Sequence, residues 1–262
     1  MRKEYDVTAL GELLIDFTEN GSSGQGNPLL EANPGGAPCN VLAMLQKLGR
    51  KTAFIGKVGQ DLFGSTLRET IEAVGINSEG LVMDKDVHTT LAFVHTFPDG
   101  DREFSFYRSP GADMMLRREE VLKEKIQASR IFHFGTLSFT HESVKEASEY
   151  AIQCAKEAGA WISFDPNLRE PLWENLEEAK KAMEYGMECC DILKIADNEL
   201  TFITGETDYD KGALYLKEKY QIPLVCVTLG KNGSRAYYKD WIPAAEPFLQ
   251  ENTIETTGAG DT

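Results

Sequence analysis

The 262-residue sequence has no run of about 18 consecutive apolar residues, the length that a membrane-spanning helix requires. Residues 1–10 also lack the long apolar segment of a secretory signal. We therefore expect a soluble, cytoplasmic protein with no membrane partner.

Basic residues are scarce, because 27 Lys and Arg stand against 42 Asp and Glu and give a formal net charge of −15. Nucleic acids are bound through clusters of Lys and Arg that displace counterions, so nucleic acid is not an expected partner. A nucleotide remains compatible with this charge if it arrives with Mg²⁺ at a local positive site.

Cysteine is rare as well: the chain has 5, an odd number, with no C-x-x-C spacing. This argues against a disulfide framework or a zinc site and favours a reducing compartment. The 4 histidines show no metal-ligand spacing and are expected to be packing or surface residues. A G-x-x-x-x-G-K-[ST] loop and a complete G-x-G-x-x-G fingerprint are both missing, which excludes the standard P-loop and dinucleotide-binding interpretations.

Apolar strand-like segments alternate with amphipathic helical segments along most of the chain. This order predicts an α/β fold with a mostly parallel sheet flanked by helices, in a single domain spanning residues 1–262. A chain of this length can bury a sizeable core. The predicted strands of the sheet are residues 7–11, 52–59, 131–135, 161–164, 191–195 and 224–230.

Residues 89–110 interrupt this alternation. Two β-type segments, 91–97 and 102–108, flank Pro-Asp-Gly-Asp at 98–101, which is a strong hairpin signal. A hairpin inserted into an α/β domain has no obvious place in the main core.

The hairpin and the apolar segment 13–17 are expected to form a small β-sheet that projects over the ligand crevice as a lid. This lid would comprise residues from about 12–33 and 89–110. Residues 19–34 are rich in Gly, Ser, Asn and Pro and are expected to be loop, with at most a brief strand at Leu29 and Leu30.

The last residues of the chain carry two glycines around one small residue, followed directly by Asp261. Such a turn at a helix start can present N–H groups to phosphate oxygens. A carboxylate beside this anion cradle suits phosphoryl transfer, because it can take the proton of the attacking hydroxyl. The alternative is a plain glycine turn whose Asp caps a helix. The predicted catalytic residues are Gly258, Ala259, Gly260 and Asp261.

A second glycine motif stands far upstream, where Gly-Gly-Ala-Pro-Cys-Asn opens a segment with apolar residues at helical spacing. Gly35 and Gly36 allow close backbone approach to a ligand, and Asn40 offers an amide donor and acceptor. Asp16, at the end of a strand-like segment, and Arg108, leaving the hairpin, are candidates for the same ligand. Taken singly, these residues also fit a flexible helix start, a turn and an exposed rim charge.

Three polar residues, Asp165, Asn167 and Arg169, follow the predicted strand 161–164, which Pro166 ends. The carboxyl ends of parallel strands face the ligand crevice, so we expect the three side chains to lie there. Arg169 offers a planar donor fork that suits phosphate. A surface turn is the alternative.

Further candidates lie toward the carboxyl terminus. Lys194 at a strand end could contact phosphate, and Glu199 could hold Mg²⁺ through water, although a helix dipole also favours a Glu at that position. Thr228, Gly230 and Gly233 could contact a nucleotide, although a hairpin turn explains them nearly as well.

The two glycine motifs in this order resemble the two signatures of the ribokinase-like (PfkB) carbohydrate kinases. The resemblance runs along nearly the whole chain and is strongest to bacterial fructokinases. It implies a Rossmann-like domain with a small β lid, ATP and Mg²⁺, and a homodimer joined through the lids; a monovalent cation such as K⁺ stays open. The segments most similar to fructokinases are residues 11–16, 31–34, 102–108 and 165–173.

The resemblance also implies roles for the candidate residues. Asp261 matches the catalytic base, and the amides of Ala259 and Gly260 match the anion hole. The positions that match the sugar site are Asp16, Gly35, Gly36, Asn40 and Arg108, and Asp165 is assigned to it as well. Asn167, Arg169 and Lys194 match positions near the phosphates. Glu199 matches the Glu of an Asn-x-x-Glu element whose Asn is replaced here by Ala196.

We therefore expect an ATP-dependent sugar kinase that transfers the γ-phosphoryl group to a primary hydroxyl, O6 of D-fructose. A 2-keto-3-deoxygluconate kinase shares the Tyr-x-Arg-like lid and the Asp-Pro-Asn-x-Arg features, and ribokinases and nucleoside kinases share the two glycine signatures. A sugar-binding regulatory protein with impaired catalysis on the same fold is an alternative from another class.

The family continues past its Gly-Ala-Gly-Asp signature, whereas this sequence ends at Thr262. We expect the chain as given to be a truncated form that binds ATP poorly and turns over little. Equal ATP affinity and equal turnover in this chain and in one carrying the family's continuation would contradict this expectation.

Overall fold

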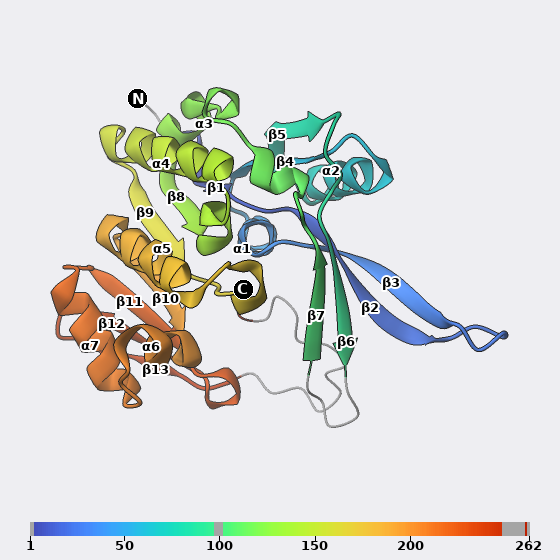
Figure 1. Cartoon of the computed structure of the whole chain (residues 1–262). Helices are drawn as coiled ribbons and strands as arrows, with labels where there is room; N and C mark the ends of the chain where they lie inside the picture. Colours follow the sequence, from blue (N-terminus) through green and yellow to red (C-terminus); the bar gives the residue numbers. More distant parts are fainter. Residues whose placement is uncertain (1–2, 97–101, 248–259, 261–262) are drawn as a thin grey trace.

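The computed structural model describes residues 3–96, 102–247 and 260 (Figure 1). The strands are β1 (Tyr5–Leu10), β2 (Leu14–Ser22), β3 (Pro28–Gly35), β4 (Thr52–Gly59), β5 (Asn77–Asp84), β6 (Leu91–Thr96), β7 (Arg102–Tyr107), β8 (Ser129–Gly135), β9 (Trp161–Asp165), β10 (Ile192–Ala196), β11 (Leu224–Thr228), β12 (Ser234–Tyr238) and β13 (Ala244–Ala245). The α-helices are α1 (Ala37–Lys47), α2 (Leu62–Val74), α3 (Lys123–Gln127), α4 (Glu142–Glu157), α5 (Leu176–Cys189), α6 (Asp197–Thr204) and α7 (Tyr209–Lys219).

A 9-stranded sheet in the order β13-β12-β11-β10-β9-β8-β1-β4-β5 forms the main body. The pairs from β11 through β5 are parallel, and only β12 and β13 at one edge run antiparallel. The predicted α/β fold with a mostly parallel sheet is confirmed. Because β1 lies between β4 and β8, the strand order reverses there, and ligands of such sheets bind beyond the carboxyl ends at this reversal.

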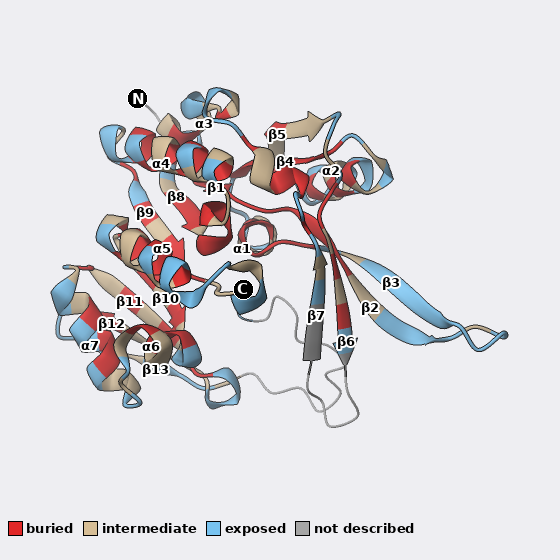
Figure 2. Ribbon diagram, viewed as in Figure 1, coloured by how far each residue is buried: buried red, intermediate tan, exposed pale blue. Residues whose placement is uncertain are grey.

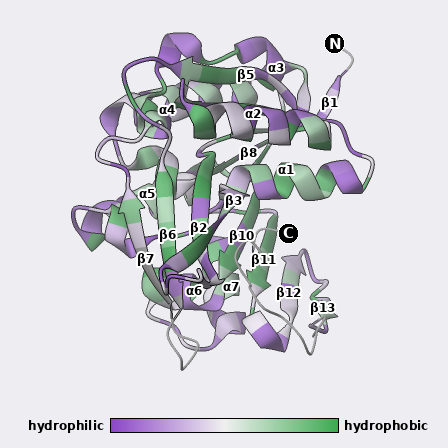
Figure 3. Ribbon diagram, turned by 90° about the vertical axis from the view of Figure 1, so that its right-hand side faces the viewer, coloured by the Kyte–Doolittle hydropathy of each residue, from purple (hydrophilic) through white to green (hydrophobic). Residues whose placement is uncertain are grey.

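Helices cover both faces of the main sheet, so its strands are buried on both sides (Figure 2). All 8 residues of β4 are buried. One apolar cluster joins α1 and α2 to Val7, Ala9 and Phe54, and another joins α4, α5 and α7 to Leu10 and Phe132. Central strands such as β10 and β11 are mostly hydrophobic, while the helices show mixed hydropathy (Figure 3).

Strands β3, β2, β6 and β7 form a separate sheet that projects from the main body (Figure 1). The predicted hairpin of β6 and β7 is confirmed, with Leu91 opposite Tyr107. The prediction that residues 19–34 are loop is wrong, because β2 and β3 form a long antiparallel ladder there. Most of β3 is exposed, so this segment needs no apolar alternation and gives no strand signal in the sequence.

Side-chain and glycine caps mark the limits of α2 and α5. Asp61 accepts the N–H of Gly64 at the start of α2, and Gly75 ends that helix with φ 97°. Asn175 accepts the N–H of Glu178 at the start of α5. Within the part of the chain that the structure describes, no helix is long and apolar enough to cross a bilayer.

Candidate active site

Asp16 and Gly35 are in contact at the base of the small sheet. Asp16 is in register with Asn33 across β2 and β3, and its side chain is 9% exposed. A Cβ on Gly35 would collide with the Asp16 carboxylate. Glycine at position 35 therefore lets this carboxylate lie directly against the backbone at the end of β3.

Gly36 forms the turn between β3 and α1. Its φ of 118° is unfavourable for other residues, and a Cβ there would collide with the carbonyl oxygen of Glu12. The N–H of Asn40 donates to the Gly36 carbonyl over 3.0 Å, which places Asn40 in the first turn of α1. The turn is thus packed backbone to backbone against the segment that joins β1 to β2.

Glu12 is a functional candidate to which the sequence analysis assigned no role. Its Oε1 accepts the N–H of Ala37 over 2.9 Å, and the residue is 5% exposed. Burial raises the pKa of its carboxyl group to about 7; nearby Asp113 adds to this rise, while backbone N–H groups and Arg108 oppose it. A charged residue inside an otherwise apolar segment was the available signal.

The raised pKa of Glu12 predicts a pH-dependent stability. Between its ordinary value of 4.5 and about 7 the folded protein keeps a proton that the unfolded chain releases, so stability is full below this window and is lost as the pH rises through it. We expect this loss to reach about 3 kcal/mol in urea unfolding and to be absent in Glu12→Gln, whose amide oxygen still accepts the Ala37 N–H. Identical pH curves for the two proteins would contradict the prediction.

Arg108 is 6% exposed, so its alternative interpretation as an exposed rim charge is wrong. Its Nε donates to Asp113 over 2.8 Å, Nη1 donates to the Thr140 hydroxyl over 2.7 Å, and Nη2 donates to the Leu137 carbonyl over 3.1 Å. Asp113 also accepts the hydroxyl of Thr90 over 2.5 Å. The guanidinium charge is therefore matched by a buried carboxylate beside the small sheet.

Asp165 and Lys194 form an ion pair at the carboxyl ends of β9 and β10. Lys194 Nζ lies 3.2 and 3.0 Å from the two carboxylate oxygens of Asp165, which is 3% exposed. A Cβ built on Gly260 would lie 3.7 Å from the same ammonium group. Gly260 is thus placed at this end of the sheet, whereas Gly258, Ala259 and Asp261 lie outside the described residues.

A small cavity joins the glycine turn to the end of β9. Its volume is about 10 Å³, close to what one water molecule requires. Glu12 and Ala37 line one side, and His133, Asp165 and Asn167 line the other. His133, predicted to be a packing or surface residue, is buried, and its Nδ1 lies 3.0 Å from the Ser163 hydroxyl.

The segment after β9 is held by Glu199. Its two carboxylate oxygens accept the N–H groups of Leu168 over 2.7 Å and Ala196 over 2.9 Å. Each oxygen keeps a further lone pair for a water, so the residue fits the predicted water-mediated contact with Mg²⁺ as well as a helix-capping role. Across the described ranges, no group of three or more His, Cys, Asp or Glu is arranged to hold a metal.

Asn167 and Arg169 lie in the same segment. Asn167 has φ 45°, a left-handed conformation that Asn tolerates better than most residues and that often marks functional sites. Arg169 Nη1 donates to the Leu168 carbonyl over 3.3 Å, and its side chain is half-buried.

Thr228 ends β11, and Gly230 and Gly233 lie in the turn between β11 and β12. The two glycines have φ 54° and 86°, and a Cβ on Gly233 would collide with the Ala245 carbonyl oxygen. A hollow of about 510 Å³ lies beside this turn. Its lining includes Tyr209, Leu229, Lys231, Asn232, Ser234 and Arg235.

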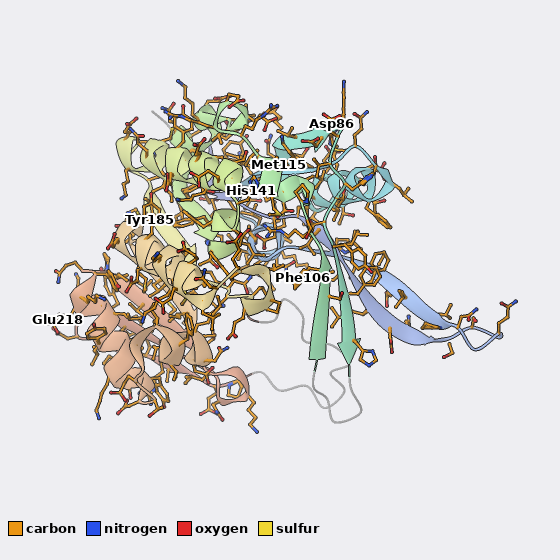
Figure 4. All side chains as sticks on the ribbon, viewed as in Figure 1. Asp86, Phe106, Met115, His141, Tyr185 and Glu218 are labelled. Carbon is orange, nitrogen blue, oxygen red and sulfur yellow. The ribbon has the colours of Figure 1, made fainter. Side chains whose placement is uncertain are left out.

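Another hollow of about 510 Å³ lies between α4 and α5 and contains none of the predicted site residues. His141 and Tyr185, both labelled in Figure 4, line it. Of the predicted residues that the structure describes, Asp165 and Asn167 share the small cavity, and Lys194 and Gly260 lie beside Asp165.

Comparison with known proteins agrees with this geometry. The family description "pfkB family carbohydrate kinase" matches residues 5–262. Fructokinase-2 of Solanum lycopersicum is 41% identical over 257 residues, which cover 97% of this chain and 78% of that protein. Fructokinase-1 of Zea mays is 40% identical with coverages of 97% and 79%.

Solved structures show the same fold. Fructokinase from Xylella fastidiosa with bound ATP has a TM-score of 0.87 and 28% identity, and the match covers 100% of this chain and 79% of that one. A fructokinase double mutant from Vibrio cholerae O395, with bound fructose, ADP and potassium ion, has a TM-score of 0.87 and 30% identity, with coverages of 100% and 81%. With this family match along the chain and these relatives, the protein belongs to the pfkB family of carbohydrate kinases.

Proposed function

We propose that this chain is an ATP-dependent fructokinase that transfers the γ-phosphoryl group of ATP to O6 of D-fructose. The observation that carries the proposal is the cavity lined by both the α1 start and the end of β9, beside the Asp165–Lys194 pair and Gly260. The tomato and maize relatives are named as fructokinases, and fructose is proposed as the sugar on that basis.

The sugar would lie between the small sheet and the α1 start. Asp16 is the proposed acceptor of sugar hydroxyl groups, while the Gly35–Gly36 turn lets the sugar approach the backbone and Asn40 adds an amide. Asp165 completes this side of the site. The small sheet, predicted from about 12–33 and 89–110, would act as a lid that excludes water.

Asp261 is the proposed base that takes the proton of the attacking hydroxyl, and the amides of residues 258–260 would form the anion hole. Asn167, Arg169 and Lys194 would lie along the phosphates, and the turn with Thr228, Gly230 and Gly233 beneath the nucleotide. Mg²⁺ would offset phosphate charge when bound, with Glu199 holding it through water. The potassium ion of the Vibrio cholerae structure makes a monovalent cation part of the proposal.

Arg108 bears on the choice of sugar. A carboxylate-bearing sugar such as 2-keto-3-deoxygluconate calls for an extra cation near the sugar, and Arg108 would be a cation of this kind. Its pairing with the buried Asp113 neutralises that charge within the protein. This favours a neutral sugar.

The test is ADP release by the chain carrying the family's continuation, with fructose, ribose, adenosine and 2-keto-3-deoxygluconate in parallel. The proposal expects fructose to give the highest kcat/KM, with the released product phosphorylated at O6 by NMR. A higher kcat/KM for another acceptor would make that acceptor the proposed substrate in place of fructose. Fructose binding without ADP release would favour the regulatory alternative.

We further propose a homodimer formed through the small sheets and a cytoplasmic location. The small sheet exposes large apolar side chains, among them Leu29 at 48% and Tyr107 at 66%. Light scattering should give twice the chain mass, and Leu29→Lys should lower it. A monomeric mass for the parent chain would contradict the dimer.

A further inference from the structure

Four chain segments connect the small sheet to the main body, and buried polar groups lie where they cross. Residues 11–13 lead into β2 and Gly36 leads out of β3; residues 85–90 lead into β6 and residues 108–111 lead out of β7. Each segment contributes a hydrogen-bonding group to this crossing, either from its own residues or from a residue one or two positions after it. The groups are the Glu12 carboxyl, the Ala37 N–H, the Thr90 hydroxyl, and the Arg108 and Asp113 side chains.

We propose that Glu12 is a positioning residue for the sugar site, whose buried carboxyl group holds the first N–H of α1 and thereby fixes the Gly35–Gly36 turn. This hydrogen bond directly joins two of the four connecting segments, since Glu12 stands between β1 and β2 while Ala37 follows β3. The inference rests on the proposed function, because it takes fructose as the ligand that the turn receives.

Backbone contacts show why one side chain can control this turn. A Cβ on Gly36 would meet the Glu12 carbonyl oxygen, and a Cβ on Gly11 would lie 2.5 Å from Pro38 Cγ. The segment from Gly11 to Leu13 and the start of α1 are therefore packed without space between them. A shift of the Ala37 N–H moves Gly36 and Asn40 with it, since the Asn40 N–H donates to the Gly36 carbonyl.

Glu12 also lies at the strand reversal, beyond the carboxyl end of β1. From there it lines the same cavity as Asp165 and Asn167. Its position therefore connects the small sheet, the α1 start and the end of β9. A residue that only stabilised the main core would not touch all three.

The charge of Glu12 decides how well this arrangement holds. The groups facing it are Asp113 and Arg108 from the segment after β7, Cys39 from α1, and His133 and Asp165 across the cavity. A neutral Glu12 accepts the Ala37 N–H and leaves Asp113 to balance Arg108. An ionised Glu12 adds a second buried negative charge beside Asp113, which disfavours the packed arrangement.

Direct fructose binding without ATP tests the inference by calorimetry at about pH 5.5 and about pH 8.5. For the parent chain we expect the fructose Kd to rise about tenfold at the higher pH, as Glu12 ionises. Glu12→Gln keeps the acceptor and cannot ionise, so its Kd for fructose should be low at both pH values. Glu12→Ala removes the acceptor and should bind about tenfold more weakly at both.

Two matched variants separate this role from others. His133→Gln removes the imidazole that lines the same cavity as Glu12, and Glu120→Gln removes a carboxylate that pairs with Lys57. Both should keep the pH dependence of fructose binding. Its loss in His133→Gln, or its persistence in Glu12→Gln, would overturn the proposal; if Glu12→Ala does not fold, the Glu12→Gln comparison decides alone.

Hydrogen exchange of the apo protein gives a readout that needs no ligand. The Ala37 amide should exchange faster in Glu12→Ala than in the parent chain or in Glu12→Gln, and unchanged exchange would overturn the positioning role. If the parent chain binds no fructose, the proposed function fails, and the exchange of residues 35–40 still tests whether Glu12 fixes the turn.

Discussion

Asp261→Asn is expected to lower kcat for fructose phosphorylation by about 10³-fold, within the range of a general base. Asparagine keeps the size and one acceptor oxygen of the side chain but cannot take the hydroxyl proton. The sugar and phosphate contacts proposed here come from other residues, so KM for fructose should change less than about threefold. Steady-state ADP release from parent and variant, both carrying the family's continuation and under the same conditions, measures both constants.

Asp240→Asn is the matched control, since Asp240 is an exposed Asp on the turn after β12. It makes the same chemical change outside the proposed site and should leave kcat within about twofold. Undiminished turnover in Asp261→Asn would remove the proposed base. A large rise in KM with unchanged kcat would instead assign Asp261 to substrate binding.

Gly36→Ala is expected to lower the free energy of unfolding by about 4 kcal/mol and to abolish measurable fructose binding. Two effects add: the backbone at φ 118° is strained for alanine, and the new Cβ would collide with the Glu12 carbonyl oxygen. Relief of the collision has to move the start of α1 or the segment before β2. Urea unfolding and fructose calorimetry measure the two effects.

Gly49→Ala isolates the backbone effect. Gly49 also has a positive φ, 73°, but a Cβ there meets nothing within 4 Å. Gly49→Ala should therefore lower the free energy of unfolding by about 1–2 kcal/mol and leave fructose binding intact. Equal destabilisation by the two substitutions, or normal fructose binding by Gly36→Ala, would show that the contact with Glu12 has no influence on the site.

The sequence predicted most elements of the fold because their signals are local. Strands such as β4 and β11 are mostly apolar segments, and α2 begins and ends at the residues whose side chains and φ angles cap it. The β2–β3 hairpin escaped prediction because its outer half is exposed and rich in turn-forming residues. Exposed strands of this kind are specified by their partner strands rather than by periodicity.

The sequence alone determined the family-type motifs, the α/β order and the residues at the carboxyl ends of the strands, because each depends on residue type and short-range spacing. The tertiary structure alone decided that Glu12 has a raised pKa and that Asp113 neutralises Arg108. Burial and charge pairing depend on groups distant in the chain, and the desolvation of a carboxyl group is set only when separate segments pack around it.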